Sequence, residues 1–251
     1  MDFAQETARP RTGDGRGVVE GAFLVLAELA RLGEAGPSQL ASATGLHKAT
    51  VHRLLNQLVA VAAVRRRDGR YRIGSQLFRL GQTWKPAEVL RAAAQRPVRE
   101  LAAASQLSVG IAVPDEGQPL FVGAVPARSA EVLSVRTGMT LSADSAAGLA
   151  IVAFAPLMPP PADHSSPAWA RLLDGVRERG VAVHHADDQL PMTCLAAPVH
   201  APHGAVVASI GAVAPAKRHV APLAEAVRRA AGMASATLAR LPAGRELFPP
   251  S

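Results

Sequence analysis

The fold is decided by the stretch Gln39-Leu40-Ala41-Ser42-Ala43-Thr44-Gly45-Leu46-His47-Lys48-Ala49-Thr50-Val51-His52-Arg53-Leu54-Leu55. It predicts two short helices joined by a tight turn, because Gly45 can adopt the positive φ that ends a helix. At about 100° per residue, the second helix gathers four apolar side chains on one arc, Val51, Leu54, Leu55 and Leu58. The opposite arc carries Ala49, His52, Arg53 and Asn56, a set that suits base edges and phosphates in a DNA major groove. An ordinary pair of helices with a solvated polar face would share this pattern.

The residues that follow favour the DNA-binding interpretation. After an apolar run at residues 59–64 comes Arg65-Arg66-Arg67-Asp68-Gly69-Arg70-Tyr71-Arg72-Ile73-Gly74. Asp68-Gly69 between two β-prone runs is typical of a two-residue hairpin. A hairpin directly after a groove-reading helix is a wing, and this wing has arginines on both strands and near its tip.

The positive charge of the chain is concentrated in this region. Between Gly45 and Lys85 there are nine basic residues and one acidic residue, a net charge of +8, whereas the whole chain carries +7, so the remainder carries −1. A basic surface confined to one helix and its wing is what binding to DNA phosphates requires. We therefore predict a winged helix-turn-helix that binds double-stranded DNA. The predicted DNA-binding residues are Lys48, Ala49, Thr50, His52, Arg53, Asn56, Arg65, Arg66, Arg67, Arg70 and Arg72.

The composition is that of a globular cytoplasmic protein. A chain of 251 residues, 49% of them apolar, can form two domains with proper cores. Its single cysteine, Cys194, excludes an intramolecular disulfide and fits a reducing compartment. Residues 1–16 lack the apolar segment of a signal peptide. The longest apolar run near a helix, residues 146–157, falls short of the ~20 residues that span a bilayer.

The pattern of elements predicts four parts. Residues 1–16 are expected to be a disordered arm, whose arginines could also reach a neighbouring groove. Residues 17–85 form the winged helix-turn-helix, and an apolar helical stripe marks its first helix, residues 18–32. That stripe consists of Val19, Phe23, Leu26, Ala27 and Ala30. Residues 86–105 form a linker helix, kinked or divided at Pro97, and residues 106–251 form a second domain.

The second domain is expected to be α+β, with one antiparallel sheet. The predicted strands are residues 108–113, 120–125, 131–136, 181–184, 194–199 and 205–213. The predicted helices are residues 142–154, 168–179 and 221–241, and a proline-rich surface loop covers residues 156–167. A sheet with a helix-lined concavity is a common way to hold a small ligand.

From residue 18 to residue 241 the sequence resembles the IclR family of bacterial transcriptional regulators. In the first half the matching motifs are Gly45-Leu46-His47-Lys48-Ala49-Thr50-Val51-His52-Arg53-Leu54-Leu55 and Tyr71-Arg72-Ile73-Gly74. In the second half they are Ala146-Ala147-Gly148, Arg179-Gly180, Cys194-Leu195-Ala196-Ala197-Pro198-Val199 and Gly204. The resemblance implies a winged helix, a linker helix and a GAF-like effector-binding domain. It also implies binding to DNA as a dimer or dimer of dimers, with a small metabolite that changes this binding.

The resemblance implies an effector pocket as well, near the proline-rich loop. The residues it indicates are Ala146, Ala147, Gly148, His184, Cys194, Gly211 and Val213. Compared with the carboxylate-binding members, Leu149 replaces a lysine, His184 an acidic residue, and Gly211 and Val213 replace serines. The pocket is therefore expected to be less polar, so that a lactone, an aromatic or a secondary metabolite fits at least as well as a small organic acid. Filling the pocket by Gly211→Leu is expected to abolish or mimic the ligand response.

Catalysis has little support in the sequence. There is no Gly-x-Ser-x-Gly motif and no phosphate-binding loop, so we expect no enzyme and no bound cofactor or metal. A metal set could be drawn from His184, His185, Asp187 and Asp188 with Cys194 or His200. Adjacent residues of a strand point in opposite directions, however, and the spacing matches no usual zinc pattern, which favours a polar rim beside the pocket. Cys194 is interpreted as a small, buried apolar residue rather than a nucleophile.

Two classes of function remain. The first is a DNA-binding regulator that responds to a ligand. The second is an enzyme or metabolite-binding protein that uses an added winged helix for protein contacts. The charge of +8 favours the first, because protein contacts do not require seven arginines in the winged helix.

Overall fold

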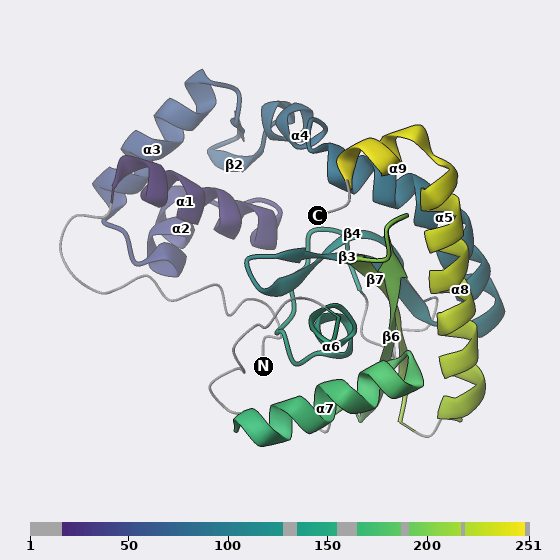
Figure 1. The fold of residues 1–251 in the computed structure, drawn as a ribbon. Helices are drawn as coiled ribbons and strands as arrows, with labels where there is room; N and C mark the ends of the chain where they lie inside the picture. The colour runs from purple at the N-terminus through teal and green to yellow at the C-terminus, as the bar shows by residue number, and fades with distance from the viewer. Residues whose placement is uncertain (1–16, 128–134, 155–164, 187–190, 217–218, 249–251) are drawn as a thin grey trace. The chain divides into compact units, whose positions relative to one another are not determined.

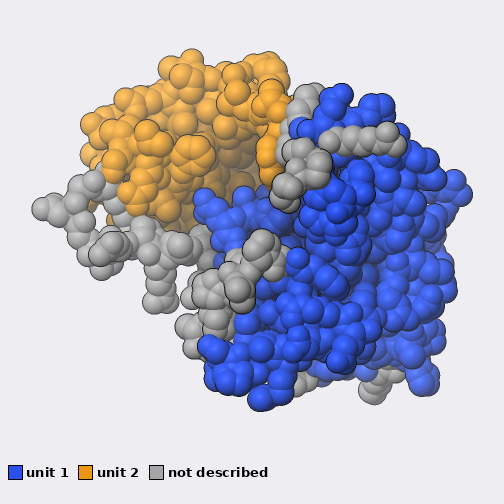
Figure 2. Space-filling view, viewed as in Figure 1, with its two compact units in different colours: residues 1–7, 85–251 blue, residues 8–84 orange. Residues whose placement is uncertain are grey.

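The computed structural model describes residues 17–127, 135–154, 165–186, 191–216 and 219–248. The chain divides into two compact units, residues 8–84 and residues 1–7 with 85–251 (Figure 2). The first is mainly helical with a two-stranded hairpin, and we call it the DNA-binding unit after the winged helix-turn-helix predicted from the sequence. The second contains a five-stranded sheet and its covering helices. The α+β fold class expected from the sequence is confirmed.

The DNA-binding unit has six elements (Figure 1). They are α1 (Val18–Leu32), α2 (Pro37–Thr44), α3 (Lys48–Ala60), β1 (Val64–Arg67), β2 (Arg70–Ile73) and α4 (Ser75–Gly81). Gly45 ends α2 with φ +68°, and its N–H donates to the carbonyl of Ala41. The predicted pair of helices with a glycine turn is therefore confirmed.

The core of this unit joins the helices to the wing. Leu29 of α1, Leu40 of α2 and Leu55 of α3 are fully buried. Tyr71 of β2 is buried as well, and its backbone exchanges hydrogen bonds of 2.9 and 3.0 Å with Ala35 in the loop between α1 and α2. The base of the wing is thus attached to the helical core.

The helix predicted at residues 18–32 is confirmed as α1, and most of the apolar stripe that marked it in the sequence is exposed. Of its residues, Leu26 is buried, but Val19 and Phe23 are 70% and 66% exposed, and Ala27 and Ala30 are exposed too. The helix buries Val25, Leu26 and Leu29 instead. Because α1 is apolar around most of its circumference, the spacing of apolar residues does not decide which side faces the core.

The second unit is built on a five-stranded sheet. Its elements are α5 (Lys85–Ser105), β3 (Ser108–Asp115), β4 (Gln118–Val125), α6 (Ala146–Val152), α7 (Ser166–Arg179), β5 (Ala182–Ala186), β6 (Met192–His200), β7 (Val206–Pro215), α8 (Val220–Arg240) and α9 (Pro242–Leu247). The strand order is β4-β3-β7-β6-β5, and every neighbouring pair is antiparallel. Helices α5 and α8 cover one face of the sheet, and α6 and α7 cover the other (Figure 1).

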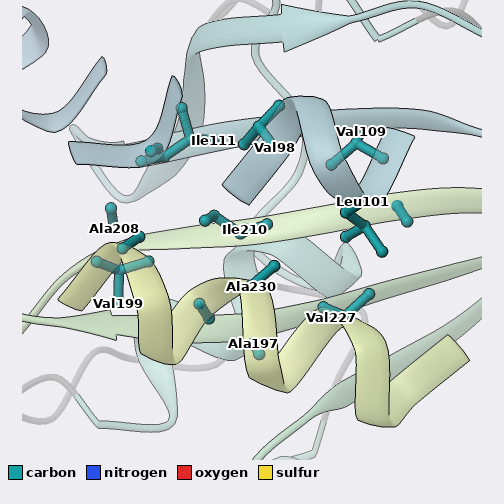
Figure 3. Close-up of a cluster of buried hydrophobic side chains, with 14 of the residues drawn as sticks. Val98, Leu101, Val109, Ile111, Ala197, Val199, Ala208, Ile210, Val227 and Ala230 are labelled. Atoms are coloured by element: carbon teal, nitrogen blue, oxygen red, sulfur yellow. The ribbon is translucent and has the colours of Figure 1, made fainter. Parts of the chain in front are cut away.

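The larger core lies between the sheet and the pair α5–α8 (Figure 3). Val109 of β3, Val199 of β6, Ile210 of β7 and Val227 of α8 have no exposed surface. Aliphatic side chains from strands distant in sequence meet here, which makes the sheet a rigid support for residues on its opposite face.

Several boundaries differ from the prediction. Helix α5 runs unbroken through Pro97, so the expected division into two helices is wrong. Helix α6 is shorter than predicted and begins after Ser145, whose hydroxyl accepts a hydrogen bond from the N–H of Gly148. Most of the predicted strand 131–136 and of the loop 156–167 lies outside the described residues, and Ser166 of that loop begins α7. Helix α9 was not predicted.

Candidate DNA interface and effector pocket

Helix α3 has one buried face and one exposed face. Val51, Leu54, Leu55 and Leu58 are buried against the rest of the unit, as predicted. Most of the predicted DNA-contacting side chains of α3 are exposed, and Thr50 is half-buried. The exposed ones are Lys48, Ala49, His52, Arg53 and Asn56. A helix anchored along one face and free along the other is able to enter a major groove.

The wing is a tight hairpin. Asp68 and Gly69 both have positive φ, +50° and +75°, which is the backbone of a type I′ two-residue turn. The hairpin predicted from Asp68-Gly69 is therefore confirmed. Its register pairs Arg65 with Arg72 and Arg67 with Arg70.

This register sorts the five arginines of the wing between two faces. Side chains of directly opposed residues share a face, and the faces alternate along each strand. Arg65, Arg67, Arg70 and Arg72 therefore share the outer face, and all four are exposed. Arg66 lies on the inner face, where its guanidinium stands 5.8 Å from the centre of the Tyr71 ring.

The outer-face arginines have different partners. Arg70 forms an ion pair of 3.0 Å with the Glu34 carboxylate, and its Nη2 donates to the Glu34 carbonyl at 3.0 Å. Arg67 lies 3.5 Å from the Asp68 carboxylate, with both side chains largely exposed. Within the part of the chain that the structure describes, no ion pair is recorded for Arg65 or Arg72. The contact with Glu34, which sequence reasoning missed, has no local signal because 36 residues separate it from Arg70.

The predicted pocket residues gather on the face of the large sheet that α6 and α7 cover. His184, Cys194, Val213 and Ser108 form one row across four neighbouring strands. Gly211 belongs to the adjacent row, in which every residue is a glycine or an alanine: Ala124, Gly110, Gly211, Ala196 and Ala182. Small side chains in this row leave room for a helix to lie close to the sheet.

Helix α6 occupies that room. Its predicted pocket residues Ala146, Ala147 and Gly148 are buried. Ala146 and Ala147 belong to the same apolar cluster as Ala182 and Val213, and Gly148 follows them in the chain. The buried hydroxyl of Ser209 in β7 donates to the carbonyl of Ala147 at 3.0 Å and attaches the helix to the sheet. Sequence reasoning missed Ser209, since nothing local marks a serine that bonds a helix 62 residues away.

Gly211 is a poor position for filling the pocket. A Cβ added there would stand 2.9 Å from the carbonyl oxygen of Leu195 in the neighbouring strand. Backbone would have to move, so Gly211→Leu would test the folding of the sheet rather than the space for a ligand. Cys194 is half-buried, faces the same side of the sheet, and is the better position.

The described pocket residues show neither an activated thiol nor a metal site. Burial raises the pKa of the Cys194 thiol above its usual value, which favours the neutral thiol over the nucleophilic thiolate. His185 lies within 3.1 Å of the Thr193 hydroxyl, one residue from His184 in the chain. Among the described residues, no three His, Cys, Asp or Glu side chains are close enough to hold a metal ion. Asp187 and Asp188 lie outside the described residues.

A groove of about 370 Å³ that the sequence did not predict lies on the other face of the sheet, between α5 and β4. Arg91, Gln95 and Arg99 of α5 line one side, and Gly123 and Val125 of β4 line the other. It is separated from the predicted pocket by the sheet. As for membranes, none of the described helices is long and apolar enough to span one.

These features define a winged-helix protein with a second α+β unit, and the comparisons agree. The family model described as the IclR helix-turn-helix domain matches residues 18–68. The glycerol operon regulatory protein of Streptomyces griseus is 31% identical over 234 residues, which cover 84% of this chain and 90% of that protein. Its counterpart in Streptomyces coelicolor is 31% identical over 192 residues, 70% of this chain and 75% of that protein. The chain therefore belongs to the IclR family of transcriptional regulators, with an N-terminal helix-turn-helix DNA-binding domain.

Solved structures share the fold over most of their length. An IclR homologue from Microbacterium hydrocarbonoxydans, crystallised with 4-hydroxybenzoate, has a TM-score of 0.75 at 23% identity, covering 88% of this chain and 98% of that one. HmgR of Pseudomonas aeruginosa has a TM-score of 0.67 at 26% identity, covering 86% of this chain and 97% of that one. The fold described above is thus shared with these structures over most of the chain.

Proposed function

We propose that this protein controls transcription by binding an operator whose affinity a small molecule changes. The observation that carries the proposal is the combination of α3, anchored by one face and exposed by the other, with a wing whose outer face holds four exposed arginines. Recognition by α3 supplies sequence selectivity, and the wing supplies affinity for phosphates. The proposed DNA-binding residues remain those predicted from the sequence.

The effector is proposed to bind on the α6 face of the large sheet, among Ala146, Ala147, Gly148, His184, Cys194, Gly211 and Val213. This surface offers a thiol, an imidazole and small apolar groups, while the buried hydroxyl of Ser108 in the same row already accepts a hydrogen bond of 2.9 Å from the N–H of Ala127. None of these seven residues is an arginine or a lysine that could bind a carboxylate. A compact, largely apolar ligand with one or two polar atoms fits it best. The 4-hydroxybenzoate bound by the Microbacterium homologue is a ligand of that size.

The proposed roles of the segments follow their order in the chain. Residues 17–85 bind DNA, residues 86–105 connect the two domains, and residues 106–251 bind the effector; the arm predicted at residues 1–16 lies outside the described residues. The protein acts in the cytoplasm as a homodimer or dimer of dimers, and has no catalytic activity. A ligand changes operator affinity only if it binds the competent and incompetent arrangements unequally.

The test is DNA binding to the region upstream of the protein's own gene. Anisotropy titrations at two salt concentrations, each with and without excess unrelated duplex, should show binding that survives competition and weakens steeply as salt rises. An equal affinity for upstream and unrelated DNA would overturn the proposal of a specific regulator. A screen of small organic compounds by thermal shift then identifies effector candidates, because a ligand stabilises the fold it binds.

A further inference from the structure

The groove between α5 and β4 lies on the opposite face of the sheet from the proposed effector surface. Its volume of about 370 Å³ suits a small molecule. Residues 91–99 of α5 form one wall, and residues 123–125 of β4 form the other. We call this hollow the α5 groove. At Arg99 and Val125 it adjoins a second hollow of about 180 Å³, which continues along α5 toward Gln106.

The α5 wall of the groove is polar and cationic. Arg91, Gln95 and Arg99 are spaced four residues apart, so they lie on one ridge of the helix. At ~1.5 Å per residue, the two arginines are about 12 Å apart along the helix axis. All three side chains carry N–H donors. Outside residues 45–85 the chain has a net charge of only −1, so this pair of arginines is not part of a generally basic surface.

Among the described residues, the two positive charges have no recorded counter-charge. The Nε of Arg91 donates to the carbonyl of Ala87 in the same helix at 3.2 Å, which leaves its two terminal nitrogens for a ligand. No ion pair within the described ranges is recorded for Arg91 or Arg99, whereas Arg96, outside the groove, pairs with Glu100 at 2.7 Å. None of the described lining residues is acidic. The ligand that complements this wall is therefore an anion.

Gly123 lets the Arg91 side chain lie against the sheet. A Cβ added at Gly123 would stand 3.4 Å from Cγ of Arg91 and 3.3 Å from Cγ2 of Ile111. The φ of Gly123 is not positive, so the need for a glycine here is one of space rather than of backbone conformation. Arg91 is accordingly half-buried, and holding its aliphatic part reduces the entropy lost when the guanidinium binds a ligand. Val98 and Ile111, both buried, give the groove an apolar floor (Figure 3).

We propose that the α5 groove binds an elongated organic dianion. Its two acidic groups lie at Arg91 and Arg99, and its apolar middle lies over Val98 and Ile111. Guanidinium groups bind carboxylates through paired N–H donors. An extended chain advances roughly 1.2 Å per bond, so a linear dicarboxylate of about ten carbons matches the spacing of the arginines. This is a second ligand site, and the inference does not rest on the proposed effector surface.

Calorimetric titration of the full-length protein, without DNA, tests the site. The first probe is sebacate, a linear dicarboxylate of the matching length. The second is decanoate, which has the same number of carbons but only one carboxylate. We expect sebacate to bind at least about tenfold more tightly than decanoate, the value of one charge-assisted contact. Raising the salt concentration should weaken the binding of sebacate, because Arg99 is exposed to solvent.

Variants of the full-length protein locate the site. Arg91→Gln and Arg99→Gln each replace a guanidinium by a neutral amide, and each should weaken the binding of sebacate about tenfold. Arg96→Gln is the matched control, because it removes the same charge from an exposed position on the same helix, and it should leave the affinity within about twofold. Gly123→Val should also weaken binding by displacing Arg91, and its thermal unfolding midpoint shows whether the sheet is intact. The exposed Arg99 has no place in the core, so Arg99→Gln keeps the test decisive even if Gly123→Val does not fold.

Three results would contradict the proposal. The first is no binding of sebacate, or an affinity for decanoate that equals it. The second is an equal loss in Arg96→Gln and in the two groove variants, which would indicate a general attraction to positive charge. The third is dependence on only one of Arg91 and Arg99, which would indicate a ligand with a single acidic group. Because the titrations contain no DNA, their failure leaves the proposed control of transcription unaffected, and a failure of specific DNA binding leaves this site unaffected.

Discussion

Arg53 lies in the middle of the exposed face of α3, next in the chain to the buried residues Leu54 and Leu55. Among the described residues, the Arg53 guanidinium forms no hydrogen bond or ion pair, so its charge and its N–H donors are available to DNA. Other arginines of the same unit differ, because Arg66 stacks on Tyr71 and Arg70 pairs with Glu34. The surroundings of a residue, more than its type, decide what its loss would change.

We expect Arg53→Ala to lose ~1–3 kcal/mol of specific operator binding, the value of one bidentate base contact, with little effect on folding. Anisotropy titrations against operator and unrelated duplex measure the difference. Arg96→Ala is the matched control, since it removes the same charge from an exposed position on α5. An unchanged preference for the operator would mean that α3 does not contact bases through Arg53.

Burial of the Cys194 thiol leads to a second expectation at this scale. Because burial raises its pKa, less thiolate is present near pH 8 than for a free thiol, and alkylation by iodoacetamide should be slower than that of glutathione. The folded state favours the protonated thiol, so this group should lower stability as pH rises above the pKa of the unfolded chain. Alkylation followed by mass spectrometry from pH 7 to 10 checks the rate. A rate equal to that of glutathione throughout would mean that the thiol is exposed.

At the scale of elements, the wing shows how register assigns roles. The two-residue turn at Asp68-Gly69 sets which arginines oppose each other, and this puts four of them on the outer face and Arg66 on the inner one. A hairpin so short has little core of its own. Its attachment through Tyr71 and Ala35 therefore determines where the outer face points.

Arg72→Ala should weaken binding to all DNA sequences alike and reduce the slope of log K against log salt by about one unit, the effect of one lost phosphate contact. Arg66→Ala should change this slope less, because its guanidinium is engaged by the Tyr71 ring. Titrations at several salt concentrations compare the two variants. Equal losses of slope would indicate that both faces of the wing touch phosphates, and a parental slope for Arg72→Ala would indicate that its outer face points to solvent.

At the scale of the whole molecule, the proposed regulation requires that ligand binding on the effector face of the sheet changes the free energy of DNA binding by the DNA-binding unit. The effector face is supported from behind by the closely packed core of Figure 3. Helix α5, which contributes to that core, is also the segment that follows the DNA-binding unit in the chain. A ligand that alters how α6 lies on the sheet changes DNA binding only if its affinity differs between two arrangements of the protein.

Cys194→Leu should fill part of the proposed pocket and abolish or mimic the ligand response, while DNA binding without ligand stays within about threefold of the parent. The free-energy coupling between ligand binding and DNA binding, ordinarily ~1–3 kcal/mol, would be lost. Operator titrations with and without an effector, for parent and variant, measure it. His203→Leu, at the exposed turn between β6 and β7, is the control. A folded Cys194→Leu protein with the parental midpoint and amplitude would exclude this part of the sheet as the ligand site.

Much of the DNA-binding unit was predictable from the chain alone. The faces of α3 follow from a clear separation of polar and apolar residues along 13 positions, and the hairpin follows from Asp68-Gly69. Both depend on interactions between residues close in sequence, which local patterns record. The confinement of charge to residues 45–85 pointed to DNA for the same reason, because it is a property of composition.

Tertiary structure alone decided the rest. The side of α1 that faces the core could not be inferred, since an apolar periodicity on nearly all sides allows several orientations, and packing selects one. Likewise His184, Cys194 and Val213 form a row only because β5, β6 and β7 pair in one register, and the pairing of β3 with β7 joins segments about a hundred residues apart. Such contacts depend on side chains that meet across the fold, so no local run of sequence contains them.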